Sequence, residues 1–227
     1  MTWDRRLVRG VQTVVEPVVG TFNQRPPKPG HPPWNHNIAQ YPVILEAAPK
    51  PCRRALDVGC GQGHLVERLA PVADAVVGIE RDRDALAAAT ERTSHLDNVT
   101  LIEADVLTAE LPLRGFDLVT AVASLHHLPL DHGLARLADL VAPGGTLVVV
   151  GLAKEQGWKD LVRSAAAFPV ANALVLRRGH TDVGAPIHDP EETLPEIAAA
   201  ADRIVPGARI RRRLLFRYTL VWTRPGD

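Results

Sequence analysis

Cysteine is scarce in this chain. Only two of its 227 residues are cysteines, Cys52 and Cys60. Cys60 lies inside a glycine-rich turn, where a disulfide would distort the backbone. The sequence therefore argues against a disulfide framework, and we expect a protein of the reducing cytoplasm.

An excess of charge of one sign is also missing. Lys and Arg together number 26, as do Asp and Glu, and the pI is about 7.1. No global positive field exists to attract nucleic acid or an anionic membrane surface. We therefore expect neither a nucleic-acid partner nor a membrane partner. Lysine occurs at only four positions, which we attribute to genomic bias: Lys28, Lys50, Lys154 and Lys159.

Long hydrophobic runs are absent as well. No stretch approaches the roughly 18 consecutive apolar residues that a membrane span needs. The partly apolar segment 11–19 contains Gln12, Thr13, Glu16 and Pro17, so it lacks the uninterrupted core of a signal peptide. We expect a soluble intracellular protein.

What the chain does have is apolar content for a substantial core. Hydrophobic residues make up 46% of a length that suits one domain with additions. We expect N-terminal helices and a proline-rich strap over residues 1–50 and a single domain over residues 51–227. Within the first part, apolar spacing predicts helices over 2–19 and 37–47, and the prolines of 24–33 indicate an extended path.

From Arg54 onward, strand and helix patterns alternate, which predicts a parallel sheet with helices on both faces. The predicted strands are 54–58, 74–79, 99–103, 116–122 and 145–151, and the predicted helices are 63–70, 82–93, 132–139 and 190–203. Residues 154–188 are expected to be irregular, with one helix over 157–168. The last predicted strands are 208–214 and 216–223.

The segment Ala55–His64 reads ALDVGCGQGH, an apolar strand that runs into Gly-x-Gly-x-Gly. Glycine lacks a Cβ, so the main chain can turn with positive φ and approach a ligand, while the next helix start offers unpaired N–H groups. A dinucleotide fingerprint needs its third glycine one position later, where this chain has His64. With Asp57 before the turn, the pattern resembles motif I of class I S-adenosylmethionine-dependent methyltransferases.

Three later segments resemble the same family, in order. Glu80 follows the strand 74–79, where a carboxylate can accept the protons of ribose hydroxyls, although an exposed surface glutamate is the alternative. Glu103–Val106 resembles the adenine-contacting segment, with Asp105 in place to take the exocyclic amine. Leu140–Val150 resembles the family's helix-turn-strand entry into strand five.

The resemblance covers residues 50–151. It implies an α/β fold with a Rossmann-like, seven-stranded, mostly parallel sheet, helices on both faces and a C-terminal antiparallel hairpin. It also implies S-adenosylmethionine as cofactor, and an acceptor pocket walled by the N-terminal additions and by residues 154–188. The residues that it assigns to the cofactor are Asp57, Gly59, Cys60, Gly61, Gly63, Glu80, Arg81, Asp105, Val106 and Ala123.

Two histidines follow the fourth predicted strand, in the segment Ala121–Pro129. Methyl transfer is an in-line displacement that depends chiefly on positioning, with a general base for a neutral hydroxyl acceptor. The resemblance puts this loop between cofactor and acceptor. We expect His126 to line the cavity and act as base, with His127 as its structural partner. The alternative is that both only hydrogen-bond the loop backbone.

The segment Trp34–Pro42 is a second candidate, because polar and aromatic groups gather there. It resembles an N-terminal His-Asn segment followed by Tyr-Pro in some small bacterial methyltransferases. His36 or Tyr41 could then meet the sulfonium or the acceptor. The alternative is a helix cap by Asn35 or Asn37 with ordinary packing.

No metal is expected, because Ser124 stands where catechol-type methyltransferases place an acidic ligand. His64 either touches the carboxylate end of the cofactor or, more simply, is an exposed residue at a helix start. A basic cluster on the last strands is interpreted as a solvated edge that resists strand pairing. Its members are Arg209, Arg211, Arg212, Arg213 and Arg217.

Together these features favour an enzyme that moves a methyl group to an O or N atom of a small molecule, in bacterial secondary metabolism or a similar setting. An RNA or protein methyltransferase that uses the arginine cluster is a second hypothesis. A protein that binds S-adenosylmethionine without transferring its methyl group is a third.

Overall fold

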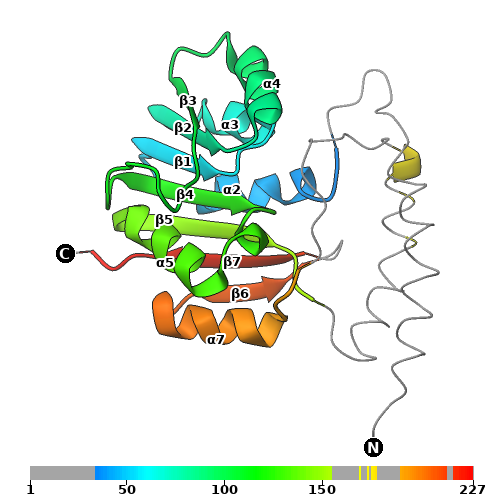
Figure 1. Cartoon of the computed structure of the whole chain (residues 1–227), viewed down its shortest axis with the longest axis vertical. Helices are drawn as coiled ribbons and strands as arrows, with labels where there is room; N and C mark the ends of the chain where they lie inside the picture. Colours follow the sequence, from blue (N-terminus) through cyan, green and yellow to red (C-terminus); the bar gives the residue numbers. More distant parts are fainter. Residues whose placement is uncertain are drawn as a thin grey trace, which may run out of the picture.

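The computed structural model describes residues 34–154, 169, 173, 175–177, 190–213 and 217–226. The helices expected over 2–19 and 157–168, the strap at 24–33 and most of the segment 154–188 lie outside these residues. The described part contains a sheet with helices packed on its two faces (Figure 1).

The sheet has seven strands in the order β3-β2-β1-β4-β5-β7-β6. The first five strands of the chain pair in parallel, and β7 pairs antiparallel with both β5 and β6. The bounds are β1 Arg54–Val58, β2 Ala75–Glu80, β3 Val99–Glu103, β4 Phe116–Val122, β5 Val141–Gly151, β6 Arg209–Arg212 and β7 Tyr218–Thr223.

The helices form two layers. α2 (Tyr41–Ala47) and α3 (His64–Leu69) pack on one face of the sheet, and α5 (Leu130–Leu140) and α7 (Leu194–Ile204) pack on the other. α4 (Arg83–Thr93) contacts α3, β2 and β3. Two 3₁₀ turns, η1 (Ile38–Gln40) and η2 (Leu125–His127), precede α2 and α5.

The core follows the two-residue period of the central strands. In β5, Leu147 and Val149 are fully buried in the cluster that includes α5 and α7, whereas Val148 and Val150 are fully buried in the cluster that includes α2 and α3. Successive side chains of a strand point to opposite faces, so a continuous apolar run serves both layers. This is the pattern of a sheet covered on both sides.

The predicted fold class is confirmed, and β1, β3 and β4 have the predicted bounds. β5 begins at Val141, four residues before the prediction, because Phe116 pairs with Val141 while Leu118 pairs with Thr146, and the sheet irregularity takes up the extra residues. The helix expected over 37–47 is divided into η1 and α2, with Pro42 in the first turn of α2.

The five parallel strands end at the same edge of the sheet. From β1 the chain proceeds through β2 to β3 on one side, and it later fills β4 and β5 on the other. The position between β1 and β4 is therefore a topological switch point, where open α/β sheets bind ligands outside the carboxyl ends of the strands. The loops after β1, β2, β3 and β4 meet there.

Candidate functional site

The loop between β1 and α3 carries three glycines in the left-handed region. Gly59, Gly61 and Gly63 have φ values of +68°, +52° and +78°. A Cβ on Gly59 would collide with Ser124 Oγ, and one on Gly63 would lie 3.1 Å from Ala89 Cα. The loop thus needs glycine both for its backbone shape and for its close contact with the loop after β4 and with α4.

Glu80 ties the end of β2 to this loop. Its Oε2 accepts a hydrogen bond from the Gly61 N–H at 2.9 Å, and its Oε1 accepts from the N–H groups of Arg81 and Asp82 at 2.8 and 2.9 Å. A carboxylate has about four lone-pair directions, so one direction on Oε2 remains for a further donor. Asp82 in turn caps α4 by accepting from the Ala85 N–H at 2.9 Å.

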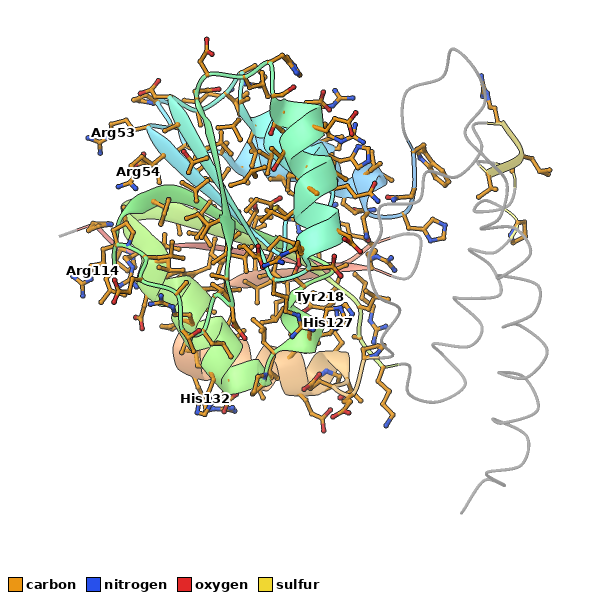
Figure 2. All side chains as sticks on the ribbon, turned by 45° about the horizontal axis from the view of Figure 1, so that its top comes forward. Arg53, Arg54, Arg114, His127, His132 and Tyr218 are labelled. Carbon is orange, nitrogen blue, oxygen red and sulfur yellow. The ribbon has the colours of Figure 1, made fainter. Side chains whose placement is uncertain are left out.

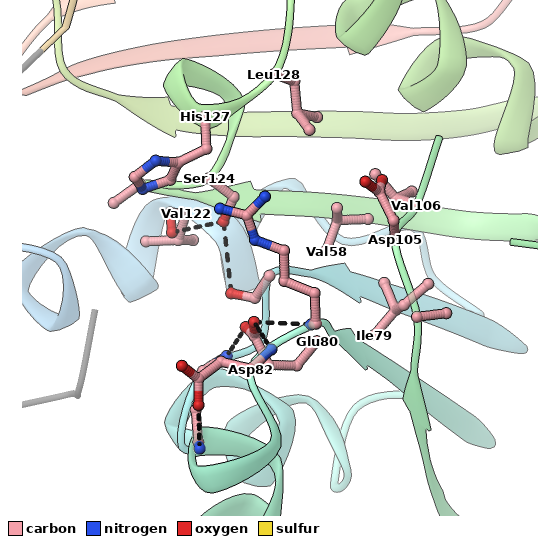
Figure 3. A pocket seen from close by; sticks show the side chains of 16 residues that line it. Val58, Ile79, Glu80, Asp82, Asp105, Val106, Val122, Ser124, His127 and Leu128 are labelled. Atoms are coloured by element: carbon pink, nitrogen blue, oxygen red, sulfur yellow. Dashed lines mark hydrogen bonds between the residues drawn. The ribbon is translucent and has the colours of Figure 1, made fainter. Parts of the chain in front are cut away.

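A pocket of about 760 Å³, open solvent included, lies above these groups. We call it the larger pocket. Figure 3 shows Glu80 below, with Asp105 and His127 at opposite sides. Its lining residues are Val58, Gly59, Gly61, Ile79, Glu80, Arg81, Asp82, Ala85, Ala104, Asp105, Val106, Val122, Ala123, Ser124, His127 and Leu128.

Seven of the ten residues that the sequence assigned to the cofactor therefore line this pocket: Gly59, Gly61, Glu80, Arg81, Asp105, Val106 and Ala123. Asp105 uses Oδ1 to accept the Leu107 N–H at 2.8 Å, so its other oxygen stays available to a donor. Asp57 and Cys60 line a neighbouring pocket instead. Gly63 lines neither of these two pockets and serves as the N-cap of α3.

The loop after β4 holds a backbone outlier. Ala123 has φ +53°, which L-residues other than Gly, Asn and Asp seldom adopt, while its N–H donates to Val150 O at 2.7 Å. Ser124 Oγ lies 3.0 Å from Val122 O and 3.4 Å from Gly59 O. Strain of this kind is concentrated at functional sites, and here it brings the β4 loop against the glycine loop.

The two histidines of η2 are placed in the reverse of the expected order. His127 lines the larger pocket, and His126 is not among the lining residues of either pocket. Successive side chains of a 3₁₀ turn point about 120° apart. Because Leu125 is directed into the core and is 2% exposed, the turn directs His127 and not His126 to the pocket. The two imidazole rings lie 4.1 Å apart.

The smaller pocket, of about 410 Å³, lies beside the larger one and shares Gly59, Gly61 and Val122 with it. Asp57 is its carboxylate. This side chain is 2% exposed and accepts a 2.7 Å hydrogen bond from Thr120 Oγ1, directly across β1 and β4. Burial raises the pKa of Asp57 to about 7, against the opposing effect of the Thr120 hydrogen bond.

Other polar groups in the smaller pocket are also desolvated. His64 is 7% exposed, which corrects the expectation of an exposed helix start, and its Nε2 is buried with no hydrogen-bond partner in the described part of the chain. Burial, with the nearby Arg92 charge, lowers the pKa of His64 to about 4, so its imidazole is neutral at pH 7. Burial also raises the pKa of Tyr41 and of the Cys60 thiol.

The N-terminal candidates divide between capping and the pocket. Asn35 Oδ1 accepts the N–H groups of Asn37 and Ile38 at 2.9 and 2.8 Å, so the capping alternative is correct for Asn35. His36 packs edge-on against Trp34, with ring centroids 5.7 Å apart, and lines neither pocket. Tyr41 lines the smaller pocket.

Several residues of the site were missed by the sequence analysis. Arg92, on α4, donates from Nε to Gln62 O at 2.9 Å and thereby holds the glycine loop. Thr120 bonds Asp57 on the neighbouring strand, and Ser124 Oγ contacts Gly59 O as well as the nearby Val122 O, so no local pattern marks the contacts with Asp57 and Gly59. The solvated-edge interpretation fits the exposed Arg209, Arg211 and Arg212 but not Arg213 and Arg217, which are partly buried.

In the described residues, no three His, Cys, Asp or Glu side chains are grouped as a metal ion requires. Every helix in these ranges is too short or too polar to cross a membrane.

Comparison with known proteins places the chain among methyltransferases. Residues 55–145 match the family described as methyltransferase domain. An uncharacterised methyltransferase of Mycobacterium tuberculosis is 38% identical over 198 residues, which span 85% of this chain and 98% of that protein. The 27-O-demethylrifamycin SV methyltransferase of Amycolatopsis mediterranei is 35% identical over 101 residues, or 42% of this chain and 37% of that protein.

Among solved structures, the N-methyltransferase NodS of Bradyrhizobium japonicum in complex with S-adenosylhomocysteine has a TM-score of 0.58 at 16% identity. The match covers 84% of this chain and 89% of that chain. A likeness at this identity concerns the fold alone. It agrees with the strand order and with the glycine loop at the switch point.

Sheet order, glycine loop and the acidic residue after β2 together define an S-adenosylmethionine-dependent methyltransferase. The chain belongs to the class I family of these enzymes. S-adenosylmethionine is its cofactor, and the site fits that molecule. The larger pocket offers carboxylates with unused lone pairs at Glu80 and Asp105, and the glycine loop leaves the space that a branched residue would fill.

Proposed function

We propose that this enzyme transfers a methyl group to an oxygen or nitrogen atom of a small molecule, with the adenosyl half of the cofactor in the larger pocket. The observation that carries the proposal is the position of His127. This histidine lines the pocket on the side opposite Asp105, in the loop after β4. A group that removes a proton from an acceptor must lie beside the cofactor, and the place of His127 in the pocket lining supports that role.

On the adenosyl side, one ribose hydroxyl donates to the remaining lone pair of Glu80 Oε2. This sharpens the expectation that Glu80 accepts both hydroxyl protons, because the N–H groups of Gly61, Arg81 and Asp82 already use the other directions. Asp105 accepts from the exocyclic amine of adenine through the oxygen that Leu107 leaves unused.

On the methionyl side, the smaller pocket provides a carboxylate, Asp57, and a neutral imidazole, His64. The ionised form of Asp57 attracts the positive charge of the cofactor's amino group or sulfonium. Tyr41 adds a hydroxyl from α2. We assign no direct role to His36, since it lies outside both pockets.

At the acceptor, His127 acts as general base for a neutral hydroxyl, a contribution of roughly 10²–10⁴-fold. Bound S-adenosylmethionine supplies a methyl group on a sulfonium, so the protein needs mainly to align the acceptor and exclude water. His126, 4.1 Å away ring to ring, positions His127 rather than touching the acceptor. An acceptor that is already nucleophilic would make the base unnecessary.

The names of partial relatives support a small acceptor. The rifamycin enzyme of Amycolatopsis mediterranei and a ubiquinone biosynthesis O-methyltransferase of Ralstonia nicotianae match less than half of this chain, at 35% and 37% identity. Both act, by their names, on small molecules. A place in bacterial secondary metabolism is part of our proposal, as is a cytoplasmic location, which the two buried free thiols favour.

The test is the mass of the methylated product. The protein is incubated with methyl-labelled S-adenosylmethionine and a cell extract that has been separated into a fraction below about 1 kDa and a macromolecular fraction. We expect label to be transferred to the small fraction and to fall when His127 is replaced by Ala. Label found only in RNA or protein would support a macromolecular acceptor, and label in neither fraction would support binding without transfer.

A further inference from the structure

Arg217, like Arg213, is a partly buried arginine between β6 and β7, and it lies at the ligand-binding edge of the sheet. It directly precedes Tyr218, which pairs with Gly151 at the carboxyl end of β5. Its Nε donates to Asn37 Oδ1 at 2.9 Å, across 180 residues of sequence. Asn37 in turn lines the smaller pocket.

The guanidinium of Arg217 has no counter-ion in the described part of the chain. None of the ion pairs there includes it, and Asn37, which is neutral, is its side-chain hydrogen-bond partner. Burial alone lowers the pKa of Arg217 to about 10, with no carboxylate to oppose the shift. Desolvated charges in proteins are ordinarily paired, so this cation is suited to bind an anion that the described residues do not supply.

A second polar group of this pocket has an unused hydrogen-bonding position. Within the described residues, His64 Nε2 is buried in the smaller pocket without a hydrogen bond. His64 lines the smaller pocket, and Arg217 donates to Asn37, another residue of its lining, so a polar ligand bound there would be placed to complete the hydrogen bonding of both groups. An Arg fork matches a carboxylate in particular, because two N–H groups can bind its two oxygens side by side.

We propose that Arg217, oriented by Asn37, binds a carboxylate of the ligands at the smaller pocket. The proposal rests on the proposed function, because it concerns the methionyl side of that site. A carboxylate reaches this place from either of two sources: the methionyl end of the cofactor or an acidic acceptor. The chemistry of recognition is the same for both, and titrations separate them.

The first titration compares S-adenosylhomocysteine with 5′-methylthioadenosine, which has the adenosyl group and the sulfur but no carboxylate. In Arg217→Gln, a cofactor carboxylate at Arg217 would make the affinity for S-adenosylhomocysteine fall at least tenfold and leave that for 5′-methylthioadenosine unchanged. Arg213→Gln is the matched control, because Arg213 belongs to the same hairpin and donates to Thr219 Oγ1 instead.

The second titration concerns an acidic acceptor. Protein saturated with S-adenosylhomocysteine is titrated with trans-aconitate, a small tricarboxylate that serves as the acidic probe, and with its uncharged trimethyl ester. If the acceptor supplies the carboxylate, Arg217→Gln leaves both adenosyl ligands unaffected and weakens trans-aconitate at least tenfold. The unmodified protein and Arg217→Gln should bind the ester with equal affinity.

A variant that adds a carboxylate guards against simple misfolding. Asn37→Asp places an internal carboxylate against the Nε of Arg217, where Asn37 Oδ1 now lies at 2.9 Å. We expect the melting temperature to rise, because the cation gains a partner, and the affinity for the carboxylate-bearing ligand to fall, because that partner competes with it. A rise in stability with loss of affinity cannot come from a damaged fold.

The outcomes are decisive. If Arg217→Gln matches the unmodified protein with S-adenosylhomocysteine, with 5′-methylthioadenosine and with trans-aconitate, the proposal is overturned. The same holds if Asn37→Asp is less stable than the unmodified protein and binds equally well. A failure of the unmodified protein to bind S-adenosylhomocysteine at all would instead overturn the placement of the cofactor, so the two failures are distinguishable.

Discussion

The larger and smaller pockets share the glycine loop but stabilise their charged groups in opposite ways. In the larger pocket, Glu80 and Asp105 accept backbone N–H groups. In the smaller pocket, Asp57 and His64 are buried. Burial raises the pKa of Asp57 and lowers that of His64, so it favours the neutral form of both side chains. The carboxylates of the larger pocket are therefore already hydrogen-bonded by the backbone, whereas the buried groups of the smaller pocket depend on a ligand to favour a charge.

This contrast has a consequence for recognition. A carboxylate already bound by N–H groups binds a hydroxyl with little rearrangement, so the larger pocket is preorganised. A desolvated carboxylate such as Asp57 gains most when a cation arrives, which makes the smaller pocket sensitive to pH and to the charge of the ligand. Figure 2 shows the side chains of the described residues, with His127 of η2 and Tyr218 of β7 labelled.

The most severe test replaces Gly61, which belongs to both pockets. Gly61→Val introduces a branched side chain at φ +52°, a conformation that such residues strongly avoid, and fills the space beside the ligand. We expect the affinity for S-adenosylhomocysteine to fall at least a hundredfold by calorimetry. Unimpaired binding would mean that the loop is only a turn.

The control for this variant is Gly144→Val. Gly144 also has positive φ, at +73°, but a Cβ there would meet nothing within 4 Å, and it lines neither pocket. Both variants should lose stability through backbone strain, and circular dichroism shows whether each remains folded. Only the Gly61 variant should lose binding.

The next largest effect concerns the larger pocket alone. Glu80→Gln keeps the size of the side chain but puts an amide donor among the N–H groups of Gly61, Arg81 and Asp82. We expect a loss of about 10–100-fold in S-adenosylhomocysteine affinity, since charge-assisted hydrogen bonds contribute roughly 1.5–3 kcal/mol.

Deoxynucleosides separate a ribose contact from mere support of the loop. If one ribose hydroxyl binds Glu80, unmodified protein should bind adenosine more tightly than its 2′- or 3′-deoxy form, and Glu80→Gln should abolish that preference. Glu103→Gln, at an exposed carboxylate that pairs with Arg83, should leave it intact. A preference that persists in the Glu80 variant would sink the ribose assignment.

A pH series tests the smaller pocket. Because the pKa of Asp57 is raised to about 7, the folded chain releases this proton at higher pH than the unfolded chain. The contribution of this group to stability is then complete below about pH 4 and is lost as pH rises through 7. Asp57→Asn cannot ionise, so its stability relative to the unmodified protein should improve by on the order of 3 kcal/mol from pH 4 to pH 8.

Urea unfolding at several pH values measures this difference. Thr120→Val provides the second point, because it removes the hydrogen bond that opposes the rise in the Asp57 pKa, and its loss of stability should extend to higher pH. Affinity for the cationic cofactor should decline in unmodified protein as pH falls below about 7, and should do so much less in Asp57→Asn. A difference in stability that does not change with pH would contradict the account of Asp57.

The smallest effect on binding is expected at η2. His127→Ala should change S-adenosylhomocysteine affinity only a few-fold, because His127 lines the pocket but binding of this ligand does not depend on a charge there. His126→Ala should change the affinity less, because His126 does not line the pocket. Turnover on a hydroxyl acceptor should fall about a hundredfold or more in His127→Ala. A larger loss of turnover in His126→Ala than in His127→Ala would restore the order that the sequence suggested.

The larger pocket could be predicted from sequence because its groups follow strand ends. Glu80 and Asp105 come where parallel strands finish, so the alternation of strands and helices places them at one edge before any coordinates are known. The glycine spacing predicted the left-handed loop in the same way. For these residues, local pattern and tertiary position coincide.

The smaller pocket could not be predicted in full, because its contacts join distant segments. Arg217 reaches Asn37 across 180 residues, and Thr120 reaches Asp57 across 63. The direction of a side chain in a short turn cannot be predicted from sequence either. In η2 it depends on which residue is buried in the core, and for this reason His127 lines the pocket where His126 was expected. Arginines with similar sequence contexts thus have different environments: Arg209 is exposed at the sheet edge, whereas Arg217 is a partly buried cation.

A crystal structure with S-adenosylhomocysteine tests the central claim most directly, because that claim assigns one half of the cofactor to each pocket. We predict a ribose hydroxyl on Glu80 Oε2, the adenine amine on Asp105 and the methionyl end among Tyr41, Asp57 and His64. The account would be contradicted by a ribose away from Glu80, or by a methionyl end that lies outside the smaller pocket.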